Sequence, residues 1–277
     1  MIGEITAFAN ALITAATNTL GGKSTQLSNW RTTLRYSSLT ALIIIATLSL
    51  FNLENLFLNS WAIGFVAGFC GGLGLPPLYK AIATGAVSFV SPVVALTQSF
   101  FLILFAITVK DESLSWSFPI AATLGAVGIF LCSRQASGNQ PVTFSIFLLA
   151  ITAGLFFSGC SLLLTGVDSS QILGALFGAR FGGFTLSLFL PPKKNKEQSQ
   201  GSGIKFALLS GSCEVIANIN FMIAINNLEL SKVGIFIAAT PALSTLIAIK
   251  LLHQRPSVTN WIGIGASSGA LAIIALN

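Results

Sequence analysis

Long stretches without a charged residue dominate this sequence. Only 8% of the residues are charged and the mean hydropathy is +0.84, whereas a soluble domain carries about a quarter charged residues. A helix needs about 20 apolar residues to cross a hydrocarbon core of roughly 30 Å. Each main uncharged stretch can hold at least one such helix: Tyr36–Leu53, Asn55–Tyr79, Ala81–Val109, Ser113–Ser133 and Gln135–Val167. The sequence therefore predicts a multi-pass integral membrane protein, and we expect it in a bacterial inner membrane.

The breaks between these stretches predict an all-α fold of about ten transmembrane helices. Lipid allows only helices or closed barrels, and the apolar runs are too long and uniform for barrel strands, which alternate at every second residue. The opening segment lacks the basic residues and cleavage site of a signal peptide, so we expect it to be retained. We expect helices near residues 4–20, 34–52, 60–80, 86–108, 115–133, 143–165, 171–190, 204–226, 233–252 and 259–276.

The chain repeats itself at two nearly equal offsets, each close to half its length. A shift of 145 residues places Gly21, Ser24, Gln26, Arg35 and Thr40 on Gly166, Ser169, Gln171, Arg180 and Thr185. A shift of 143 residues places Ala81, Ile82, Ser88, Val90, Ala95 and Thr97 on Ala224, Ile225, Ser231, Val233, Ala238 and Thr240. The pattern predicts two five-helix repeats, residues 1–138 and 139–277. Because five is odd, the second repeat would be inverted in the membrane.

The basic residues fall mainly on one side of the predicted bundle. The loops after the odd-numbered helices, with the adjoining helix ends, contain Lys23, Arg31, Arg35, Lys80, Arg134, Lys193, Lys194, Lys196, Lys205, Lys250 and Arg255. The other side has only Lys110, Lys232 and Arg180. An excess of Lys and Arg marks the cytoplasmic face, so this bias predicts external termini. It also explains the Lys193–Lys205 run without nucleic-acid binding.

Several segments resemble the EamA-type drug/metabolite transporter superfamily over nearly the whole chain. They are the opening GEITAFANALITAATNTL, the Arg-Tyr and Arg-Phe starts of the second and seventh helices, PLYKAIATGAVSFVSPVVAL, and FMIAINNLELSKVGIFIAATPALSTL. The family commonly has Gly-Glu after helices 4 and 9, where this chain has Asp111-Glu112 and Gln254-Arg255. The resemblance implies five plus five helices, export of metabolites, amino acids or xenobiotics, and cytoplasmic termini. The last point conflicts with the charge bias, which we favour.

Glu214 is the leading candidate for a functional residue. It lies about ten residues, or roughly 15 Å, inside the helix expected at 204–226, where a carboxylate is costly unless it is paired, protonated or open to water. Ser210, Asn218 and Met222 share its helix face at spacings of four. We expect Glu214 and Asn218 to contact substrate, with Glu214 as the candidate proton carrier. The alternative is a structural acid, bonded to a neighbouring helix or nearer the interface.

The first helix has a second polar stripe, formed by Thr6, Asn10, Thr14 and Asn18, with Thr17 beside it. We interpret Asn10, Thr14 and Asn18 as cavity candidates, and hydrogen bonding between helices is the equal alternative. Arg180 is a further cavity candidate, because it lies on the side of the predicted bundle that has few basic residues and the charge bias does not explain it. It could pair with Asp168 or bind an anionic substrate group.

Prolines interrupt the apolar helices in both halves. We expect helix breaks at Pro76, Pro77, Pro92 and Pro241, because proline removes a backbone donor and leaves a carbonyl to be satisfied elsewhere. Paired breaks point to a central transport site, and packing kinks are the alternative. Under the 143-residue offset Pro241 faces Gln98. Gln98, Thr97 and Thr240 therefore join the cavity candidates.

Glycines and cysteines indicate packing and not chemistry. Gly64, Gly68 and Gly72, and likewise Gly174, Gly178 and Gly182, recur every four residues and predict close helix contacts. The four cysteines, Cys70, Cys132, Cys160 and Cys213, lie in apolar segments without metal-ligand spacing. We therefore expect no metal and no cofactor.

Together these features predict a secondary carrier that exports a small organic solute by alternating access. The sequence shows no ATP-binding loop, so a gradient must supply the energy, with a proton as the candidate coupling ion. An intramembrane enzyme would need clustered catalytic groups, and we find none. A non-transporting scaffold or receptor is the alternative function. The expected partners are the solute and the lipid bilayer, without nucleic acid, and the sequence leaves the oligomeric state open.

Overall fold

The uncharged stretches form α-helices in the computed structural model, which describes residues 1–50, 58–83, 87–113, 116–133, 143–190, 200–252 and 258–275. No strand occurs in these ranges, so the all-α class is confirmed. The elements are α1 (Ile2–Leu27), α2 (Trp30–Leu50), α3 (Leu58–Ala83), α4 (Val87–Val109), α5 (Ser117–Ser133), α6 (Phe144–Leu164), the 3-10 helix η2 (Ser169–Gln171), α7 (Ile172–Phe189), α8 (Gln200–Asn227), α9 (Leu230–Ala238), α10 (Thr240–Leu252) and α11 (Val258–Ala275).

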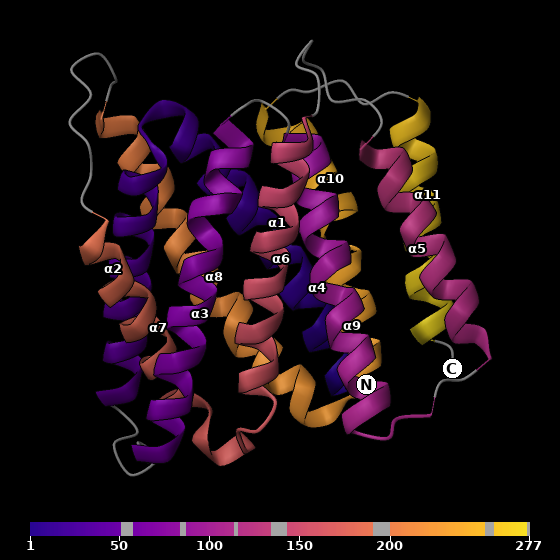
Figure 1. Ribbon diagram of the computed structural model, residues 1–277, viewed down its shortest axis with the longest axis horizontal. Helices are drawn as coiled ribbons and strands as arrows, with labels where there is room; N and C mark the ends of the chain where they lie inside the picture. Colours follow the sequence, from indigo (N-terminus) through magenta and orange to yellow (C-terminus); the bar gives the residue numbers. More distant parts are fainter. Residues whose placement is uncertain are drawn as a thin grey trace.

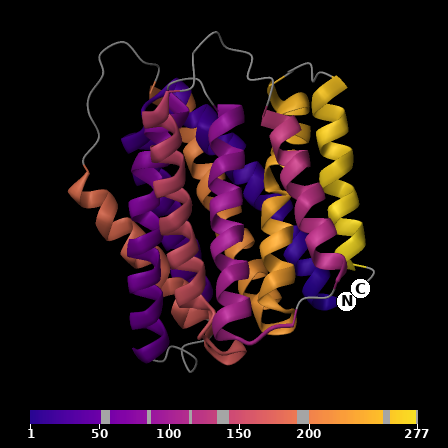
Figure 2. The same ribbon diagram turned by 45° about the vertical axis from the view of Figure 1, so that its right-hand side comes forward.

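The helices run side by side in one bundle, with the start of α1 and the end of α11 at the same end (Figure 1). Turning the molecule shows α5 and α11 paired along one edge (Figure 2). Within the described residues, six helices are long and apolar enough to cross a membrane, namely α2, α3, α4, α6, α7 and α8. These helices establish a multi-pass membrane protein. The count of ten spans stays a prediction.

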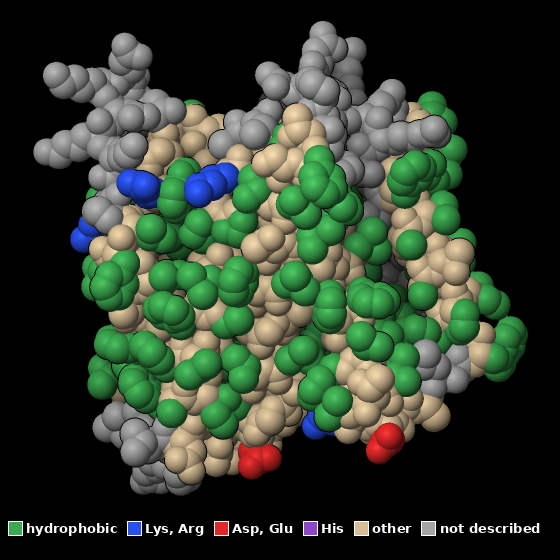
Figure 3. All heavy atoms as spheres, in the orientation of Figure 1, with side chains coloured by type: hydrophobic (Ala, Val, Ile, Leu, Met, Phe, Trp, Pro, Cys, Tyr) green, Lys and Arg blue, Asp and Glu red, His purple; other side chains and the backbone are tan. Residues whose placement is uncertain are grey.

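The surface has the distribution of side chains that a lipid environment requires. Hydrophobic side chains cover the middle of the face in Figure 3, and charged side chains gather toward its two ends. Large apolar residues such as Ile43, Phe100 and Leu188 are exposed on the surface of the bundle. In a soluble protein so much exposed apolar surface would favour aggregation. In a bilayer it faces acyl chains.

The observed helix bounds lie close to the expected ones, with one break and two extensions. The helix expected at 233–252 is split at Ala239 into α9 and α10, next to Pro241. The helices α1 and α8 are longer than expected, reaching Leu27 and beginning at Gln200. Their ends are polar, and a hydropathy pattern ends where apolar residues end, even when hydrogen bonding continues.

The helix breaks predicted at Pro76, Pro77 and Pro92 are wrong. The helix α3 continues through Pro76 and Pro77, and α4 continues through Pro92. Each proline removes one backbone hydrogen bond. Ending the helix would leave many more groups without partners, which is costly away from water, so the remaining i→i−4 bonds persist.

The two halves of the chain interlock. The most extensive contacts all join a helix of the first half to one of the second, led by α1 with α8, α3 with α7, α5 with α11 and α3 with α6. Under the predicted five-helix repeat, the pairs of helices in contact correspond to one another. For example, α1 on α8 corresponds to α6 on α3, and α3 on α7 corresponds to α8 on α2. The centre of the bundle is therefore built by both halves.

The glycine-rich faces of α3 and α7 pack directly on one another. A Cβ at Gly64 or Gly68 would overlap the carbonyl oxygen of Ala175 or Ala179, and a Cβ at Gly178 would overlap that of Trp61. In lipid, helix association depends on such close packing, because the hydrophobic effect does not drive helices together there. The predicted packing role is confirmed for Gly64, Gly68 and Gly178.

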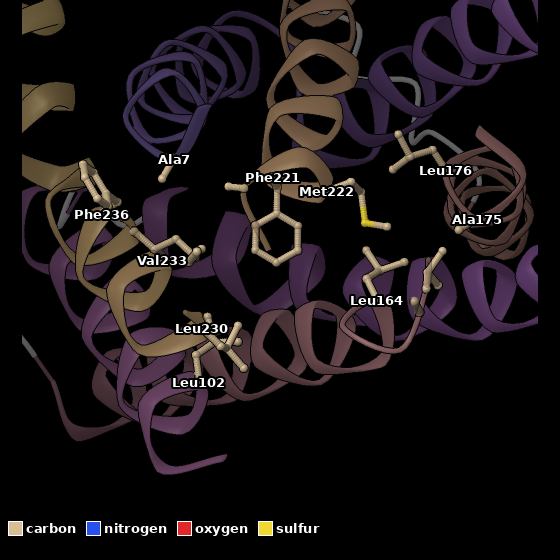
Figure 4. Packing of buried hydrophobic residues seen from close by; sticks show 14 of the residues in the cluster. Ala7, Leu102, Leu164, Ala175, Leu176, Phe221, Met222, Leu230, Val233 and Phe236 are labelled. Carbon is tan, nitrogen blue, oxygen red and sulfur yellow. The ribbon is translucent and has the colours of Figure 1, made fainter. Parts of the chain in front are cut away.

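Buried apolar side chains converge from helices of both halves toward the end of the bundle that holds the termini. Figure 4 shows Phe221 and Met222 of α8 among Leu164 of α6 and Val233 of α9. Met222 and Leu164 are almost fully buried, at 0% and 1% exposure. This apolar cluster fills the bundle near the end that holds the termini. Polar residues lie farther from that end.

The turn after α4 is anchored to the start of α9. Asp111 has a left-handed backbone, with φ 52, and the Glu112 N–H donates to the Ala106 carbonyl at 3.1 Å. This reversal directs the Glu112 carboxylate to the N-terminus of α9. Its two oxygens accept the N–H groups of Leu230 at 2.8 Å and Ser231 at 3.0 Å. A carboxylate is well placed there, since it satisfies unpaired donors and faces the positive end of the helix dipole.

Candidate functional site

A cavity of about 220 Å³, lined by apolar and polar side chains together, lies between helices of both halves of the chain. Its described lining comes from α1, α2, α3, α4, α6, α7, α8, α9 and α10, and none comes from α5 or α11. Most of the predicted cavity candidates line it, namely Asn10, Thr14, Asn18, Gln98, Arg180, Glu214, Asn218 and Thr240. That any of them contacts a substrate stays a prediction.

An ion pair between Arg180 of α7 and Glu214 of α8 marks the middle of the cavity. The Arg180 Nη1 donates to Glu214 Oε1. The side chains are 14% and 28% exposed, so both reach the cavity without being open to bulk solvent. Glu214 lies about 21 Å along α8 from Gln200, halfway through the helix. At such depth each charge is tolerable because the other compensates it.

The partner of Arg180 is Glu214 and not the predicted Asp168, while contact of Arg180 with an anionic substrate group stays a prediction. Asp168, the alternative partner, is exposed at the start of η2. Arg180 therefore reaches inward along its helix to Glu214 and not down to the loop. Among the described residues that line the cavity, these two are the charged ones. The lining is electrically neutral as a whole.

The polar stripe of α1 faces α8 and joins the two helices. Asn10 Nδ2 donates to the Ala217 carbonyl at 2.8 Å, and Ser210 Oγ donates to the Thr17 carbonyl at 3.0 Å. Both interpretations of this stripe therefore hold: Asn10 bonds a neighbouring helix and also lines the cavity. Thr6 differs, since its hydroxyl donates to the carbonyls of Ile2 and Gly3 and the residue does not line the cavity.

The face of α4 is divided between the cavity and α6. Gln98 lines the cavity and its Nε2 donates to Ser161 Oγ at 3.1 Å. Thr97 does not line it, which corrects our expectation. Its hydroxyl donates to the Val93 carbonyl at 2.8 Å, and its side chain packs against Gly154 of α6. Neighbouring residues in a helix point about 100° apart. Thr97 therefore lies off the cavity although Gln98, next to it, lines the cavity.

The break between α9 and α10 faces the cavity. Ile237, Thr240, Pro241 and Ser244 lie at spacings of three and four, on one face, and all line it. Pro76, Pro77 and Pro92 lie outside this lining. Of the four prolines expected at helix breaks, Pro241 alone stands beside a break within the described residues.

Sequence reasoning missed several lining residues because nothing in their immediate sequence is unusual. Tyr79, Cys160, Phe157 and Phe221 belong to apolar stretches, yet they line the cavity. A Cβ at Gly21 would lie 3.3 Å from both the Tyr79 hydroxyl and Ser210 Oγ. Tyr79 could have been found as one of only two tyrosines in the chain, because a buried hydroxyl commonly seeks a polar partner.

Comparisons with known proteins agree with this architecture. Residues 141–276 match the model of the EamA-like transporter family, which confirms the resemblance seen in the sequence motifs. A search of the curated proteins finds no match. Among solved structures 29 chains match. One of them, described as "Crystal structure of protein", is 19% identical with a TM-score of 0.73, over 99% of this chain and 96% of that chain. At that identity the likeness shows the fold alone.

Proposed function

We propose that this chain is a secondary transporter that exports a small organic metabolite or drug through the central cavity. The match of residues 141–276 to the EamA-like transporter family supports transport as the function. The observation that carries this proposal is the Arg180–Glu214 pair at mid-membrane in a cavity lined by both halves. A buried pair of charges is seldom more stabilising than an apolar contact of equal size. Its place in a cavity is therefore better explained by binding.

The proposed mechanism is alternating access between two inverted repeats, residues 1–138 and 139–277. The pairs of helices in contact correspond under this repeat, which supports two equivalent units. The apolar cluster around Phe221 and Leu164 lies toward the ends of α8 and α6, and both residues also line the cavity. Rocking one repeat against the other would open this cluster and close the opposite end. The solute would occupy the cavity throughout.

Arg180 and Glu214 have distinct roles in this mechanism. Arg180 would bind a negative group of the solute, and Glu214 would bind a positive group. Either contact would compete with the ion pair between the two side chains. Protonation of Glu214 would neutralise it and release Arg180, which makes Glu214 the proposed proton carrier. Asn10, Asn18 and Asn218 supply amide groups around the pair. They can hydrogen-bond a polar solute without adding charge.

Flux through proteoliposomes tests the proposal. The purified chain is reconstituted, and uptake of a panel of amino acids, metabolites and cationic dyes is measured with and without an imposed pH gradient. We expect flux of at least one solute, and we expect Glu214→Gln to remove its dependence on pH. Asp168→Asn is the matched control, since that carboxylate is exposed and does not line the cavity.

Two outcomes would contradict the proposal. If no solute crosses the vesicles with a folded protein, the alternative of a non-transporting scaffold or receptor gains support. If Glu214→Gln transports with unchanged pH dependence, Glu214 is not the proton carrier. A scaffold would have no need for a partly polar cavity at mid-membrane, and for this reason it is the less favoured function.

A further inference from the structure

Two residues that line the cavity beside the break between α9 and α10 carry hydroxyl groups without a partner. Thr240 Oγ1 and Ser244 Oγ are buried and make no hydrogen bond within the described part of the chain. Thr240 is only 5% exposed. Both residues line the cavity and, four apart in one helix, share a face. An unpaired hydroxyl in such a site commonly has a function, because leaving it unbonded is costly.

The other helical threonines show how unusual Thr240 is. Thr17 donates to the Ile13 carbonyl at 3.0 Å, and Thr97 donates to the Val93 carbonyl at 2.8 Å. Thr97 is the counterpart of Thr240 under the 143-residue offset. A hydroxyl that bonds the carbonyl four residues back is already satisfied. The Thr240 hydroxyl has no such bond and is available to a ligand.

The backbone N–H groups at the same break are already used. The Ala239 N–H lies within reach of the carbonyls of Ile235, Phe236 and Ile237, and the N–H groups of Ala242 and Leu243 both donate to the Ala239 carbonyl, at 3.1 and 3.2 Å. Residue 241 is a proline and has no N–H to donate. These backbone groups are therefore not available as donors to an anion.

A further oxygen reaches the cavity from α1, which packs against α10. Asn10 is 7% exposed, and its Nδ2 donates to the Ala217 carbonyl at 2.8 Å. This bond identifies the amide orientation and leaves Oδ1 as an acceptor on a residue that lines the cavity. Arg180 is paired with Glu214, so its charge is compensated and repels a cation little.

We propose that the hydroxyl groups of Thr240 and Ser244, with the amide oxygen of Asn10, form a site for a compact monovalent cation. Hydroxyl and amide oxygens without a carboxylate suit a weakly held hard cation. Sodium ion and the ammonium group of a solute share this chemistry. The use of the site in transport rests on the proposed function, but binding of the cation does not.

Thermal unfolding of the purified protein in detergent tests the site without requiring flux. The midpoint is measured in choline chloride, which is too bulky for the site, and choline is then replaced by sodium or by methylammonium at constant chloride. At a cation concentration ten times the dissociation constant, we expect the midpoint to rise by about 3–6 °C. Thr240→Val and Ser244→Ala should lose the rise. Thr97→Val should keep it, because that hydroxyl bonds its own helix.

The two arms identify the source of the cation. A rise with sodium assigns the site to an ion, whereas a rise with methylammonium alone assigns it to an ammonium group of the solute. Thr240→Ser keeps the hydroxyl and should keep the response, which separates ligation from folding if Thr240→Val is unstable. Two results would overturn the inference: no rise in either arm for the unchanged chain, or an equal rise in Thr240→Val. Flux without a cation response would overturn the site alone, and a cation response without flux would overturn the carrier alone.

Discussion

At the scale of single residues, the chemistry of this protein rests on groups that a bilayer penalises. Arg180 and Glu214 are each unfavourable at mid-membrane, and each is tolerable because it faces the other across the cavity. The pair is partly exposed to the cavity, so neither charge is locked away from a solute. A structural ion pair would be expected to have full burial and further hydrogen bonds. Within the described part of the chain, this pair is joined through Arg180 Nη1 and Glu214 Oε1.

Glu112 is a second carboxylate with an identifiable task, and its loss should loosen the start of α9. We expect Glu112→Gln to lower the free energy of unfolding by about 1–2 kcal/mol, because two N–H groups lose a charged acceptor. Thermal unfolding in detergent measures the change. Glu229→Gln is the matched control: that residue precedes α9 but makes no side-chain cap bond and is 54% exposed. Equal losses in the two variants would exclude the capping role of Glu112.

At the scale of helices, packing depends on where side chains are missing. The helices α3 and α7 approach closely because glycines face each other's backbones, and no larger residue fits there. The break at Ala239 has the opposite character, since it interrupts one helix and presents hydroxyl groups to the cavity. The side of the cavity formed by α3 and α7 is closely packed, whereas the side formed by α9 and α10 contains a helix break. We expect the first side to be rigid and the second to change shape more easily.

The contact between α3 and α7 gives a sharp test of this packing. We expect Gly68→Ala to destabilise the folded protein by about 2–4 kcal/mol, because its Cβ would overlap the Ala179 carbonyl and backbone must move. Gly22→Ala is the control, since nothing lies within 4 Å of a Cβ there. It should be neutral or stabilise α1 by up to about 1 kcal/mol. Unfolding midpoints and the yield of monodisperse protein report both, and a tolerated Gly68→Ala would contradict the packing.

At the scale of the whole molecule, the bundle has two ends of different charge. Lys23, Arg31 and Lys80 lie toward the end opposite the termini, while Glu112 and Lys232 lie toward the end that holds them. The positive excess predicts that this end is cytoplasmic. Because α1 begins and α11 ends at the same face, both termini have the same predicted location, outside the cytoplasm.

Reporter fusions at the C-terminus decide this orientation. We expect a fused alkaline phosphatase to be active and a fused green fluorescent protein to be dark, since the first matures only outside the cytoplasm and the second folds well only inside. Fluorescence without phosphatase activity would instead support the cytoplasmic termini that the family resemblance implies. Replacing Arg31 and Arg35 by Gln should weaken the bias, so a shift toward fluorescence in that variant would link orientation to charge.

Much of the fold could be predicted from the sequence, whereas the site could be predicted only in part. Hydropathy located the helices because each must cover a fixed thickness of hydrocarbon with apolar residues. Arg180 and Glu214 were recognisable singly, as charges where charge is costly. Their pairing was not, because it depends on how far α7 and α8 are rotated toward each other. These helices are consecutive in the chain yet pack little against one another.

The uncharged stretches themselves determined an all-α membrane protein, its helix positions and the glycine faces. Those properties follow from local solvation and side-chain size, which sequence expresses directly. Only the tertiary structure decided that Arg180 binds Glu214, that Thr97 leaves the cavity while Thr240 enters it, and that Pro92 continues a helix whereas Pro241 stands at a break. Each of these depends on the rotation and contacts of several helices at once, and no single stretch of sequence contains that information.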